Sequence, residues 1–330
     1  MTRTHNQEIT DLVDLCAPDG TLLAAARGYT RRPLHRANLR GWGRNKRWEY
    51  WGIITPTHVV GLTLSSLDYA AVHECFVLDR QRKTERKHGA IVPLGRGARL
   101  PDAPPPVRAT ARARELEYEF SDEPGGTRIH ARAAGVELRA FVEDAGDSLG
   151  VVVPWSETLF QYTVKSVARP VSGELRIDGV SVEIPAGSSW ATLDRGRGRW
   201  PYEIRWNWAA GGGLVDGKRL GLQLGGQWTE GTGATENALF VDGVMHYIPD
   251  EVRWRYDARR WDAPWHIRSD RVDVTLEPFY VRNASTNLLV LGSEVHQAFG
   301  RWSGWMSDSA GARHSIDGIL GWAEQAENRW

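Results

Sequence analysis

Short alternations of apolar and polar residues run along most of the chain, and Gly and Pro residues separate them. A period of two residues is typical of β-strands that bury one face, whereas an amphipathic helix would show a period of 3.6. The alternation therefore indicates a β-protein. It predicts strands at 59–64, 113–120, 128–133, 136–142, 175–177, 181–184, 200–208, 219–224, 238–241, 244–248, 272–276 and 288–291.

Turn and helix signals refine this pattern. The dipeptides at 178–179 and 242–243 are both Asp-Gly between apolar alternations, which is the strongest short-range signal for a two-residue β-hairpin. Good helix formers follow Asp317 and Gly318, so a short C-terminal helix is predicted over 319–330. A second short helix is predicted near residues 8–15.

An aromatic strand pattern occurs twice in the chain. The first copy reads WEYWG, VGLTL and CFVLD between residues 48 and 79, and the second reads WNWAAG, LGLQL and LFVDG between residues 206 and 243. A pattern repeated at this distance indicates a duplication that builds two equivalent half-molecules. We therefore predict an all-β fold with domains at 1–165 and 166–330, and a site inside the halves or between them.

Composition excludes several classes of function. Lys plus Arg equals Asp plus Glu at 41 each, so no overall positive field recruits nucleic acid. Cys16 and Cys75 are the only cysteines and stand in no metal-ligand or disulfide spacing. No apolar run approaches the ~20 residues of a membrane span. We expect a cytoplasmic protein with no transmembrane segment, no metal, no cofactor and no nucleic-acid partner.

Several longer motifs resemble one family. These motifs are WGRNKRWEYWG (42–52), LDRGRGRWPYEIRWNWAAGGG (193–213), TENALFVDG (235–243), DVTLEPFY (273–280), HQAFGRWSG (296–304) and GWAE (321–324). Together they resemble the domain of unknown function 2804 family, which is distantly similar to the carotenoid-hydratase-like group of hydroxyneurosporene synthase and tocopherol cyclase. The resemblance implies two tandem lipocalin-like antiparallel β-barrels packed together, in agreement with the duplication. It implies no settled activity.

The second predicted hairpin carries three candidate polar residues. With a two-residue turn at 242–243, Asn237 and His246 share one face as diagonal neighbours, and Glu236 points to the other face. If the face of Asn237 lines a cavity, His246 can move protons near neutral pH while the amide orients a substrate oxygen. The alternative is a His satisfied by a backbone carbonyl on an otherwise apolar face. Glu236 is a further candidate acid.

Aromatic residues form a predicted wall in both halves. Period-two alternation puts Tyr202, Trp206 and Trp208 on one face of the 200–208 strand. The equivalent face of the first half carries Trp48 and Tyr50. Such a wall is either a large contribution to the core or a surface for fused rings, polyenes, sugars or a developing carbocation.

Two aspartates are candidate acids. Asp194 stands at the start of an expected loop, DRGRGRWP, in which Arg alternates with Gly. It either holds a turn or points against Trp206, where an apolar environment would favour the neutral acid. Asp68 lies at the corresponding place after the GLTL strand of the first half.

Three functions remain open on these observations. The first is a cofactor-independent enzyme of the hydratase, dehydratase, isomerase or cyclase type, with Asp194 and His246 as the acid/base pair and a hydrophobic or polycyclic small molecule as substrate. The second is a non-catalytic binding protein for a lipid or other small molecule. The third is a glycoside hydrolase with paired carboxylates, because tryptophan faces also suit sugars. No nucleotide or metalloprotease motif is present.

Overall fold

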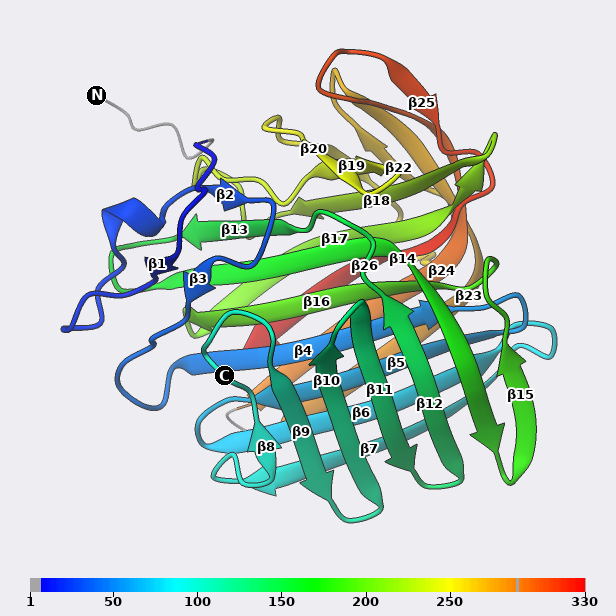
Figure 1. Ribbon diagram of the computed structural model, residues 1–330, viewed down its shortest axis with the longest axis horizontal. Helices are drawn as coiled ribbons and strands as arrows, with labels where there is room; N and C mark the ends of the chain where they lie inside the picture. Colours follow the sequence, from blue (N-terminus) through cyan, green and yellow to red (C-terminus); the bar gives the residue numbers. More distant parts are fainter. Residues whose placement is uncertain (1–6, 289–290, 330) are drawn as a thin grey trace.

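Curled antiparallel sheets account for nearly the whole molecule (Figure 1). The computed structural model describes residues 7–288 and 291–329. Its strands form two large sheets with the arrangement of twin lipocalin-like barrels, as predicted. Within the described residues, the only helical element is a single 3-10 turn. No helix in this part of the chain is long and apolar enough to cross a bilayer. The small N-terminal elements are β1 (Val13–Asp14), η1 (Ala24–Ala26) and β3 (His35–Arg36), where β1 and β3 pair in parallel.

The first sheet has 14 strands in the described part of the chain. Its path runs β7-β6-β5-β4-β16-β14-β12-β11-β10-β9-β8, and β13, β15 and β2 pair beside it. The strands along the path are β7 (Thr84–Pro93), β6 (Ala70–Asp79), β5 (His58–Ser66), β4 (Asn45–Ile54), β16 (Trp190–Arg199), β14 (Phe160–Ile177), β12 (Val136–Glu143), β11 (Gly126–Ala133), β10 (Leu116–Glu123), β9 (Arg108–Ala113) and β8 (Ala98–Arg99). The additional strands are β13 (Leu149–Pro154), β15 (Val180–Ile184) and β2 (Tyr29–Thr30).

The second sheet has 10 strands in the same described part. Its path runs β20-β19-β18-β17-β26-β24-β23-β22-β21, with β25 beside β24. The strands are β20 (Val244–Tyr247), β19 (Ala238–Val241), β18 (Lys218–Gly226), β17 (Glu203–Val215), β26 (Leu320–Arg329), β24 (Leu291–Ser307), β23 (Val272–Leu288), β22 (Trp265–Arg268), β21 (Arg253–Arg255) and β25 (Arg313–Ser315).

The chain passes from the first sheet to the second between β16 and β17. The expected division after residue 165 falls inside β14, which is continuous from Phe160 to Ile177. β4 pairs with β16 and β5, and β17 pairs in the same way with β26 and β18. The two copies of the sequence repeat therefore occupy equivalent places in the two sheets.

Both predicted hairpins are present with the predicted register. Asp178 and Asp242 have positive φ angles of 49° and 48°, and the glycine after each is also positive. Two consecutive positive φ angles match the tight turn that follows the right-handed twist of a β-ribbon. Val241 pairs with Val244, and Leu239 pairs with His246.

The predicted helices are wrong. The segment from Leu320 to Arg329 is β26, which lies between β17 and β24 in the middle of the second sheet. Tertiary pairing on both edges outweighs the helix propensity of its Ala, Glu and Gln residues. The expected helix at 8–15 is extended and contains β1. In the strand expected at 288–291, residues 289 and 290 lie outside the described part of the chain, between β23 and β24.

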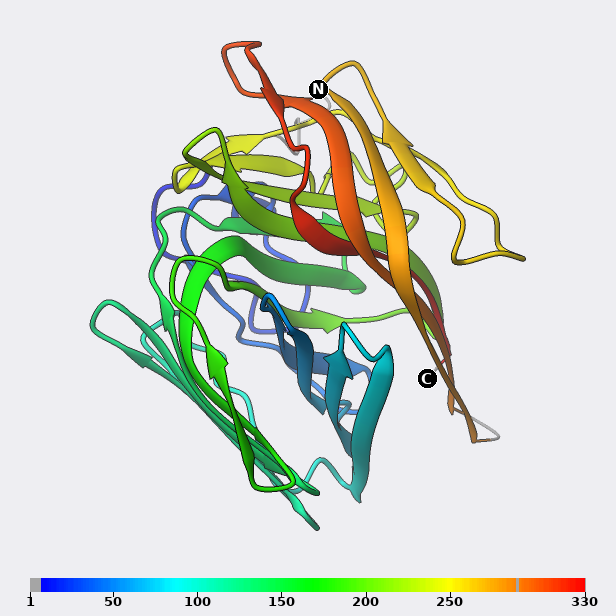
Figure 2. The same cartoon turned by 90° about the vertical axis from the view of Figure 1, so that its right-hand side faces the viewer.

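Three large apolar clusters form most of the core, one in each barrel and one between the sheets. Figure 2 shows the two curled sheets facing each other. The cluster between them includes the ring of Phe76 from β6, which stacks on Phe299 from β24 at 5.7 Å between ring centroids. Because this cluster contains residues from both sheets, the halves share a dry interface and pack as one body.

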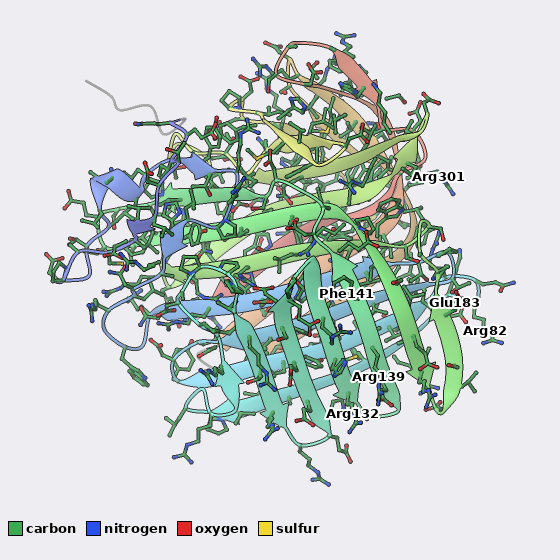
Figure 3. All side chains as sticks on the ribbon, in the orientation of Figure 1. Arg82, Arg132, Arg139, Phe141, Glu183 and Arg301 are labelled. Atoms are coloured by element: carbon green, nitrogen blue, oxygen red, sulfur yellow. The ribbon has the colours of Figure 1, made fainter. Side chains whose placement is uncertain are left out.

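The outward face of the first sheet is charged. Arg132 and Arg139 project from β11 and β12 (Figure 3) and contact Glu137 at 3.5 and 2.8 Å. Exposed ion pairs of this kind contribute at most about 1 kcal/mol each. These charged side chains occupy the outward face of the strands. The opposite face of the same strands packs into the first barrel.

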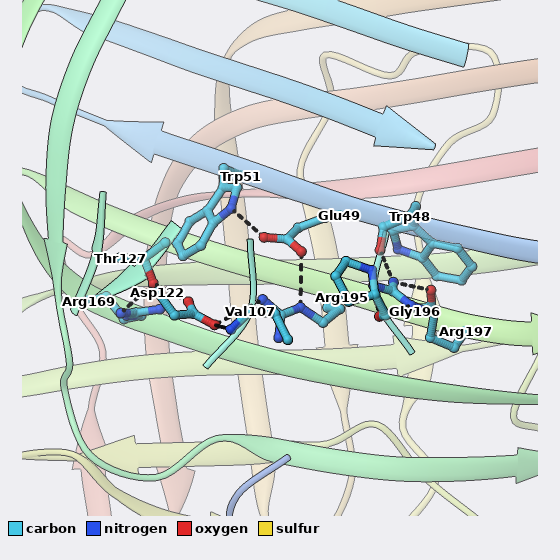
Figure 4. Close-up of polar contacts among 11 residues, drawn as sticks. Trp48, Glu49, Trp51, Val107, Asp122, Thr127, Arg169, Arg195, Gly196 and Arg197 are labelled. Carbon is cyan, nitrogen blue, oxygen red and sulfur yellow. Dashed lines mark hydrogen bonds and ion pairs between the residues drawn. The ribbon is translucent and has the colours of Figure 1, made fainter. Parts of the chain in front are cut away.

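A buried polar network braces the interior of the first barrel (Figure 4). Glu49 accepts hydrogen bonds from Trp51 at 3.1 Å and from Arg195 at 3.0 Å, and Arg195 also approaches Asp122. Asp122 accepts a further bond from the hydroxyl of Thr127 at 3.0 Å. Glu49, Trp51 and Arg195 lie on the face of β4 and β16 that points into the first barrel. Their hydrogen bonds therefore stabilise the two strands whose opposite face points to the second sheet.

Candidate functional site

A largely apolar cavity lies between the two sheets. Its volume is about 300 Å³, and side chains from β4, β5, β6, β14 and β16 face others from β17, β23, β24 and β26 across it. Most of its surface is apolar. The residues used below are Trp48, Tyr50, Thr63, Glu74, Lys165, Asp194, Trp200, Trp206, Trp208, Trp228, Glu236, Arg282, Gln297 and Glu324, all of which line it.

One row of side chains crosses the cavity face of the first sheet. Strand pairing places Lys165, Asp194, Tyr50, Thr63 and Glu74 side by side on β14, β16, β4, β5 and β6. All five residues line the cavity. We call this set the first row, and it carries three ionisable groups besides the tyrosine.

A matching row crosses the second sheet. Pairing places Arg282, Gln297, Glu324 and Trp208 side by side on β23, β24, β26 and β17. All four line the same cavity. We call this set the second row. Since β26 pairs with β17 as β16 pairs with β4, Glu324 occupies in the second half the place that Asp194 occupies in the first.

The two rows contact each other at both ends. Arg282 of the second row forms an ion pair with Glu74 of the first. At the other end, the Lys165 ammonium lies over the Trp208 ring, 4.6 Å from its centroid. A cation over an indole face is attracted by the ring quadrupole, most strongly where water is excluded. These contacts fix the separation of the two cavity walls.

Lys165 and Asp194 form a buried ion pair. The Nζ of Lys165 lies 2.9 Å from Oδ1 of Asp194, and Thr163 donates to the same oxygen at 3.2 Å. Only 2% of Lys165 and 8% of Asp194 is exposed. Asp194 is in the middle of β16 and not in the expected loop, and its cation partner is this lysine and not the neighbouring arginines. Arg195 and Arg197 point away into the first barrel, where Figure 4 shows them.

Glu236 is the most deeply buried acid of the cavity, with 1% of its surface exposed. Its Oε2 accepts the indole N–H of Trp228 at 3.1 Å, and its Oε1 has no hydrogen-bond partner. Burial raises the pKa of the Glu236 carboxyl to about 7, and the charge of Asp194 acts in the same direction. Lys165 and the Trp228 N–H oppose this rise in pKa. Glu236 is therefore a proton-bearing acid near neutral pH.

Glu324 is held in a similar way on the second row. Its Oε1 accepts the indole N–H of Trp206 at 2.9 Å. Burial raises the pKa of Glu324 to about 7, while the Trp206 hydrogen bond and the charge of Arg282 act to lower it. Two carboxyls on the wall of one largely apolar cavity thus titrate near neutral pH, each anchored by one tryptophan.

A tryptophan cluster closes one end of the cavity. Trp200 is its centre, and it contacts the edges or faces of four others at centroid distances of 5.0 to 6.1 Å. Edge-to-face packing of this kind is the favoured geometry for aromatic pairs. The four surrounding rings are Trp48, Trp155, Trp206 and Trp228.

Gly196 explains how Trp48 fits against β16. A Cβ at position 196 would lie 2.1 Å from the Trp48 ring, a separation that no side chain tolerates. The alternation of Arg with Gly in DRGRGR therefore has a structural meaning. The arginines turn into the first barrel, and the glycine on the opposite face makes room for an indole of the cavity.

Six of the predicted site residues meet in this cavity. The period-two prediction of the aromatic faces is correct for the residues that line the wall, and two of the predicted acids join them. The six are Trp48, Tyr50, Asp194, Trp206, Trp208 and Glu236. Tyr202, predicted on the same wall, precedes the start of β17 and is 46% exposed.

The other candidates lie elsewhere. His246 is on β20 and contacts Ser309 at 3.1 Å, so it is not placed beside Asp194. Asn237 is buried, but its side chain bonds to the backbone of Gly225 and Asp250 and makes no contact with His246. The carboxylate of Asp68 accepts backbone N–H groups at positions 43 and 45, which makes it a structural group.

The sequence reasoning missed Lys165, Glu324, Trp228 and Arg282. A signal for Glu324 was present, because the duplication that relates the two aromatic strands also relates the strands beside them. The incorrect helix at 319–330 concealed it. Lys165 and Arg282 gave no local signal, since each is a single charge in a strand and its partner comes from elsewhere in the fold. In the described part of the chain, no group of three or more His, Cys, Asp or Glu is placed to hold a metal ion.

Comparison with known families identifies the chain. The family model described as "Domain of unknown function (DUF2804)" matches residues 6–330. The chain belongs to the DUF2804 family. This confirms the resemblance seen in the motifs. No curated protein matches the sequence of this DUF2804 member.

Solved structures share the fold of this DUF2804 protein. An AttH-type protein from Nitrosomonas europaea aligns with a TM-score of 0.53 and 14% identity, over 86% of this chain and 92% of the other. Kievitone hydratase from Nectria haematococca aligns with a TM-score of 0.52 and 10% identity, over 87% and 89%. CghA, solved with Sch210972, aligns with a TM-score of 0.52 and 12% identity, over 92% and 90%. At such identities the likeness shows the fold, which this chain thus shares with a hydratase.

Proposed function

We propose that the protein is a cofactor-independent acid/base enzyme of the hydratase, dehydratase, isomerase or cyclase type. Its substrate would be a hydrophobic or polycyclic small molecule that binds in the cavity between the two sheets. The observation that carries the proposal is the pair of buried glutamates, Glu236 and Glu324, whose pKa values are raised to about 7 beside a cluster of indole rings. Kievitone hydratase, with the same fold, is named for a hydratase activity.

Glu236 has the properties of the general acid. Its Oε2 is occupied by the Trp228 N–H, so the carboxyl proton belongs on Oε1, which has no acceptor within the protein. In the first step, a carbon–carbon double bond of the substrate would use its π electrons to bind this proton. The O–H bond of Glu236 breaks, a carboxylate remains, and a carbocation forms in the substrate.

The surroundings suit that cation. The rings of Trp206, Trp208 and Trp228 line the cavity, and indole rings attract positive charge. Glu324 would act as the base in the second step. It would take a proton either from a water molecule that attacks the cation, which gives hydration, or from a neighbouring carbon, which gives isomerisation. Its pKa near 7 allows it to accept a proton at neutral pH.

Asp194 and Lys165 would set the electrostatics of the two acids. The charge of Asp194 favours protonation of both glutamates, and that of Lys165 opposes it. The pair thereby keeps the pKa values of Glu236 and Glu324 near neutrality.

Deuterium incorporation from D2O tests this function even where the product has not been identified. The probes are uncharged polycyclic and isoprenoid alkenes that the protein retains in equilibrium dialysis. Proton transfer to an alkene carbon adds one deuterium to the recovered molecule, which mass spectrometry detects. We expect incorporation with the wild type and a loss of about 10² to 10⁴ in its rate with Glu236→Gln.

The matched control is Glu183→Gln, because Glu183 is an exposed acid of β15 (Figure 3). It should leave the exchange rate unchanged. Binding of the alkenes without any deuterium uptake would instead indicate a non-catalytic binding protein. Full exchange by Glu236→Gln would show that another group supplies the proton.

A further inference from the structure

The two cations of the first and second rows are paired within the protein. Lys165 is bonded to Asp194 at 2.9 Å, and Arg282 is bonded to Glu74. Both cations are largely buried, with exposed side-chain fractions of 2% and 12%. An acidic ligand would therefore find each of these two cations already neutralised by a carboxylate of the opposite charge.

The two remaining acids strengthen this argument. Glu236 and Glu324 have pKa values raised to about 7 by burial, so below that pH they are neutral. A ligand carboxylate beside them would be a further buried negative charge, and the cations of both rows are already paired with carboxylates. Burying an unpaired charge costs several kcal/mol or more, and it would also disfavour ionisation of both acids. The middle of the cavity is thus suited to an uncharged molecule.

One polar group in this region, the hydroxyl of Tyr50, is positioned to bind a ligand. Gln297 accepts a hydrogen bond from Nη1 of Arg282 at 3.4 Å, and it lies close enough to Tyr50 to influence its hydroxyl. While the Gln297 oxygen accepts from the arginine, its amide N–H is available as a donor to the Tyr50 oxygen. In the described part of the chain, no hydrogen bond uses the hydroxyl proton of Tyr50, so this proton can point to a ligand in the cavity that Tyr50 lines.

The structure holds that hydroxyl in a defined place. The Tyr50 ring packs edge-to-face against Trp208 and Trp322, with centroids 5.6 and 6.1 Å away. Gly61 leaves space beside the hydroxyl, because a Cβ at this position would lie 3.2 Å from it. Burial raises the pKa of Tyr50, so the hydroxyl stays protonated and acts as a donor.

We propose that the cavity selects an uncharged ligand with a large apolar body and one carbonyl or ether oxygen, and that Tyr50 donates a hydrogen bond to this oxygen. Tyr50 is then a positioning residue in the middle of the first row, directly beside Asp194. The inference rests on the proposed function only in that it takes the same cavity as the substrate site.

Three probes that share a ring system test this selectivity. They are 2-acetylnaphthalene, 2-ethylnaphthalene and 2-naphthoate, which present a ketone, no polar atom and a carboxylate. Dissociation constants are measured by equilibrium dialysis at about pH 6, where the naphthoate is ionised and the two glutamates are mostly neutral. We expect the ketone to bind about fivefold to tenfold more tightly than the hydrocarbon, and the carboxylate to bind more weakly than both.

Two variants locate the effect. Tyr50→Phe should remove the preference for the ketone and leave the affinity for the hydrocarbon unchanged. Tyr118→Phe is the matched control, since the Tyr118 hydroxyl is buried in the core of the first barrel and contributes nothing to the cavity. It should bind all three probes like the wild type. Thermal melts establish that both variants are folded.

The opposite results would overturn the inference. Tightest binding of the naphthoate would show an anion site, and a ketone preference that survives in Tyr50→Phe would place the donor elsewhere. The test is independent of turnover, because Glu236→Gln should lose deuterium exchange and keep the order of affinities. Failure of the proposed function therefore leaves a different signature from failure of this inference.

Discussion

Asp68 and Glu236 each lie just before the third strand of their half but differ in their surroundings. Each stands two residues before the third strand of its repeat, β6 in one case and β19 in the other. The carboxylate of Asp68 accepts the backbone N–H groups of Gly43 and Asn45 at 2.6 and 3.1 Å and lies 3.6 Å from Arg47. Glu236 receives a single indole N–H and keeps one oxygen without a partner. The acid before β6 thus fastens a loop, whereas the acid before β19 is buried with one oxygen that no protein group binds.

The same divergence separates Asp194 from Glu324. The strand next to Asp194 supplies Lys165, whereas the strand next to Glu324 supplies the neutral Gln297 at the equivalent place. The equivalent places in the two halves therefore hold an ion pair on one wall and, on the other, a carboxyl whose pKa is raised to about 7. The comparison shows that the number of donors and cations around a carboxylate, and not its place in the fold, decides its role.

Replacing the strand neighbours of Asp194 and Glu324 by methionine should give the largest effect on stability. Lys165→Met leaves the Asp194 charge buried without its cation and should lower the free energy of unfolding by about 3 to 5 kcal/mol. Gln297→Met, the matched change in the second half, removes an uncharged acceptor at 3.4 Å from Arg282, which keeps its ion pair with Glu74, and should cost about 1 kcal/mol. Urea unfolding at neutral pH measures both. Equal losses would mean that the two walls are not electrostatically different.

The pH dependence of stability should distinguish Glu236 from Asp68. The pKa of Glu236 is higher in the folded state, at about 7, than the value of 4.5 expected in the unfolded chain. Its contribution to stability is therefore fully present below pH 4.5 and is lost as the pH rises through 7. With about 1.4 kcal/mol per pKa unit, the loss is on the order of 3 kcal/mol.

Glu236→Gln should accordingly match the wild type at low pH and exceed its stability above pH 7. Asp68→Asn should be less stable than the wild type at neutral pH, because it weakens the acceptor of two backbone N–H groups. Thermal melts of both variants between about pH 4 and pH 8 test this contrast. A gain in stability for Asp68→Asn at high pH would contradict the structural role assigned to it.

A smaller effect is expected from making the two walls alike at one position. Strand pairing places Gly196 beside Trp48, and Ala326 beside Trp206 in the second half. Gly196→Ala copies the second half into the first, but its methyl group would overlap the Trp48 ring. We expect a loss of about 1 to 3 kcal/mol in the free energy of unfolding. A neutral result would indicate that Trp48 can move without cost. Gly89→Ala controls for backbone effects alone, because Gly89 lies in strand β7 and an added Cβ would meet only an ordinary contact at 3.7 Å.

The sequence predicted the fold and one side of the site because both depend on period-two alternation. That period fixed which residues of β17 share a face, and so Trp206 and Trp208 were correctly grouped. It does not say which face turns inward. The predicted register of the β19–β20 hairpin is correct. The side chain of His246, however, contacts Ser309 and lies outside the cavity.

The remaining site residues depend on contacts between distant strands. Lys165 and Asp194 are 29 residues apart in sequence and meet only because β14 pairs with β16. Glu324 was hidden by local preference, since Ala, Glu and Gln favour a helix until two neighbouring strands claim the segment. Information of this kind appears in the assembled sheet and not in any short window of the chain.

The location of the cavity between the sheets has a practical consequence for engineering. Val72 and Ile91 line the first wall near one edge, on β6 and β7, away from the strands that carry Glu324 and Trp206. Shortening these two side chains enlarges the cavity and leaves Glu236 and Glu324 unchanged. A library that varies only these two positions would therefore change the shape of the cavity while Glu236, Glu324 and the tryptophan cluster stay constant.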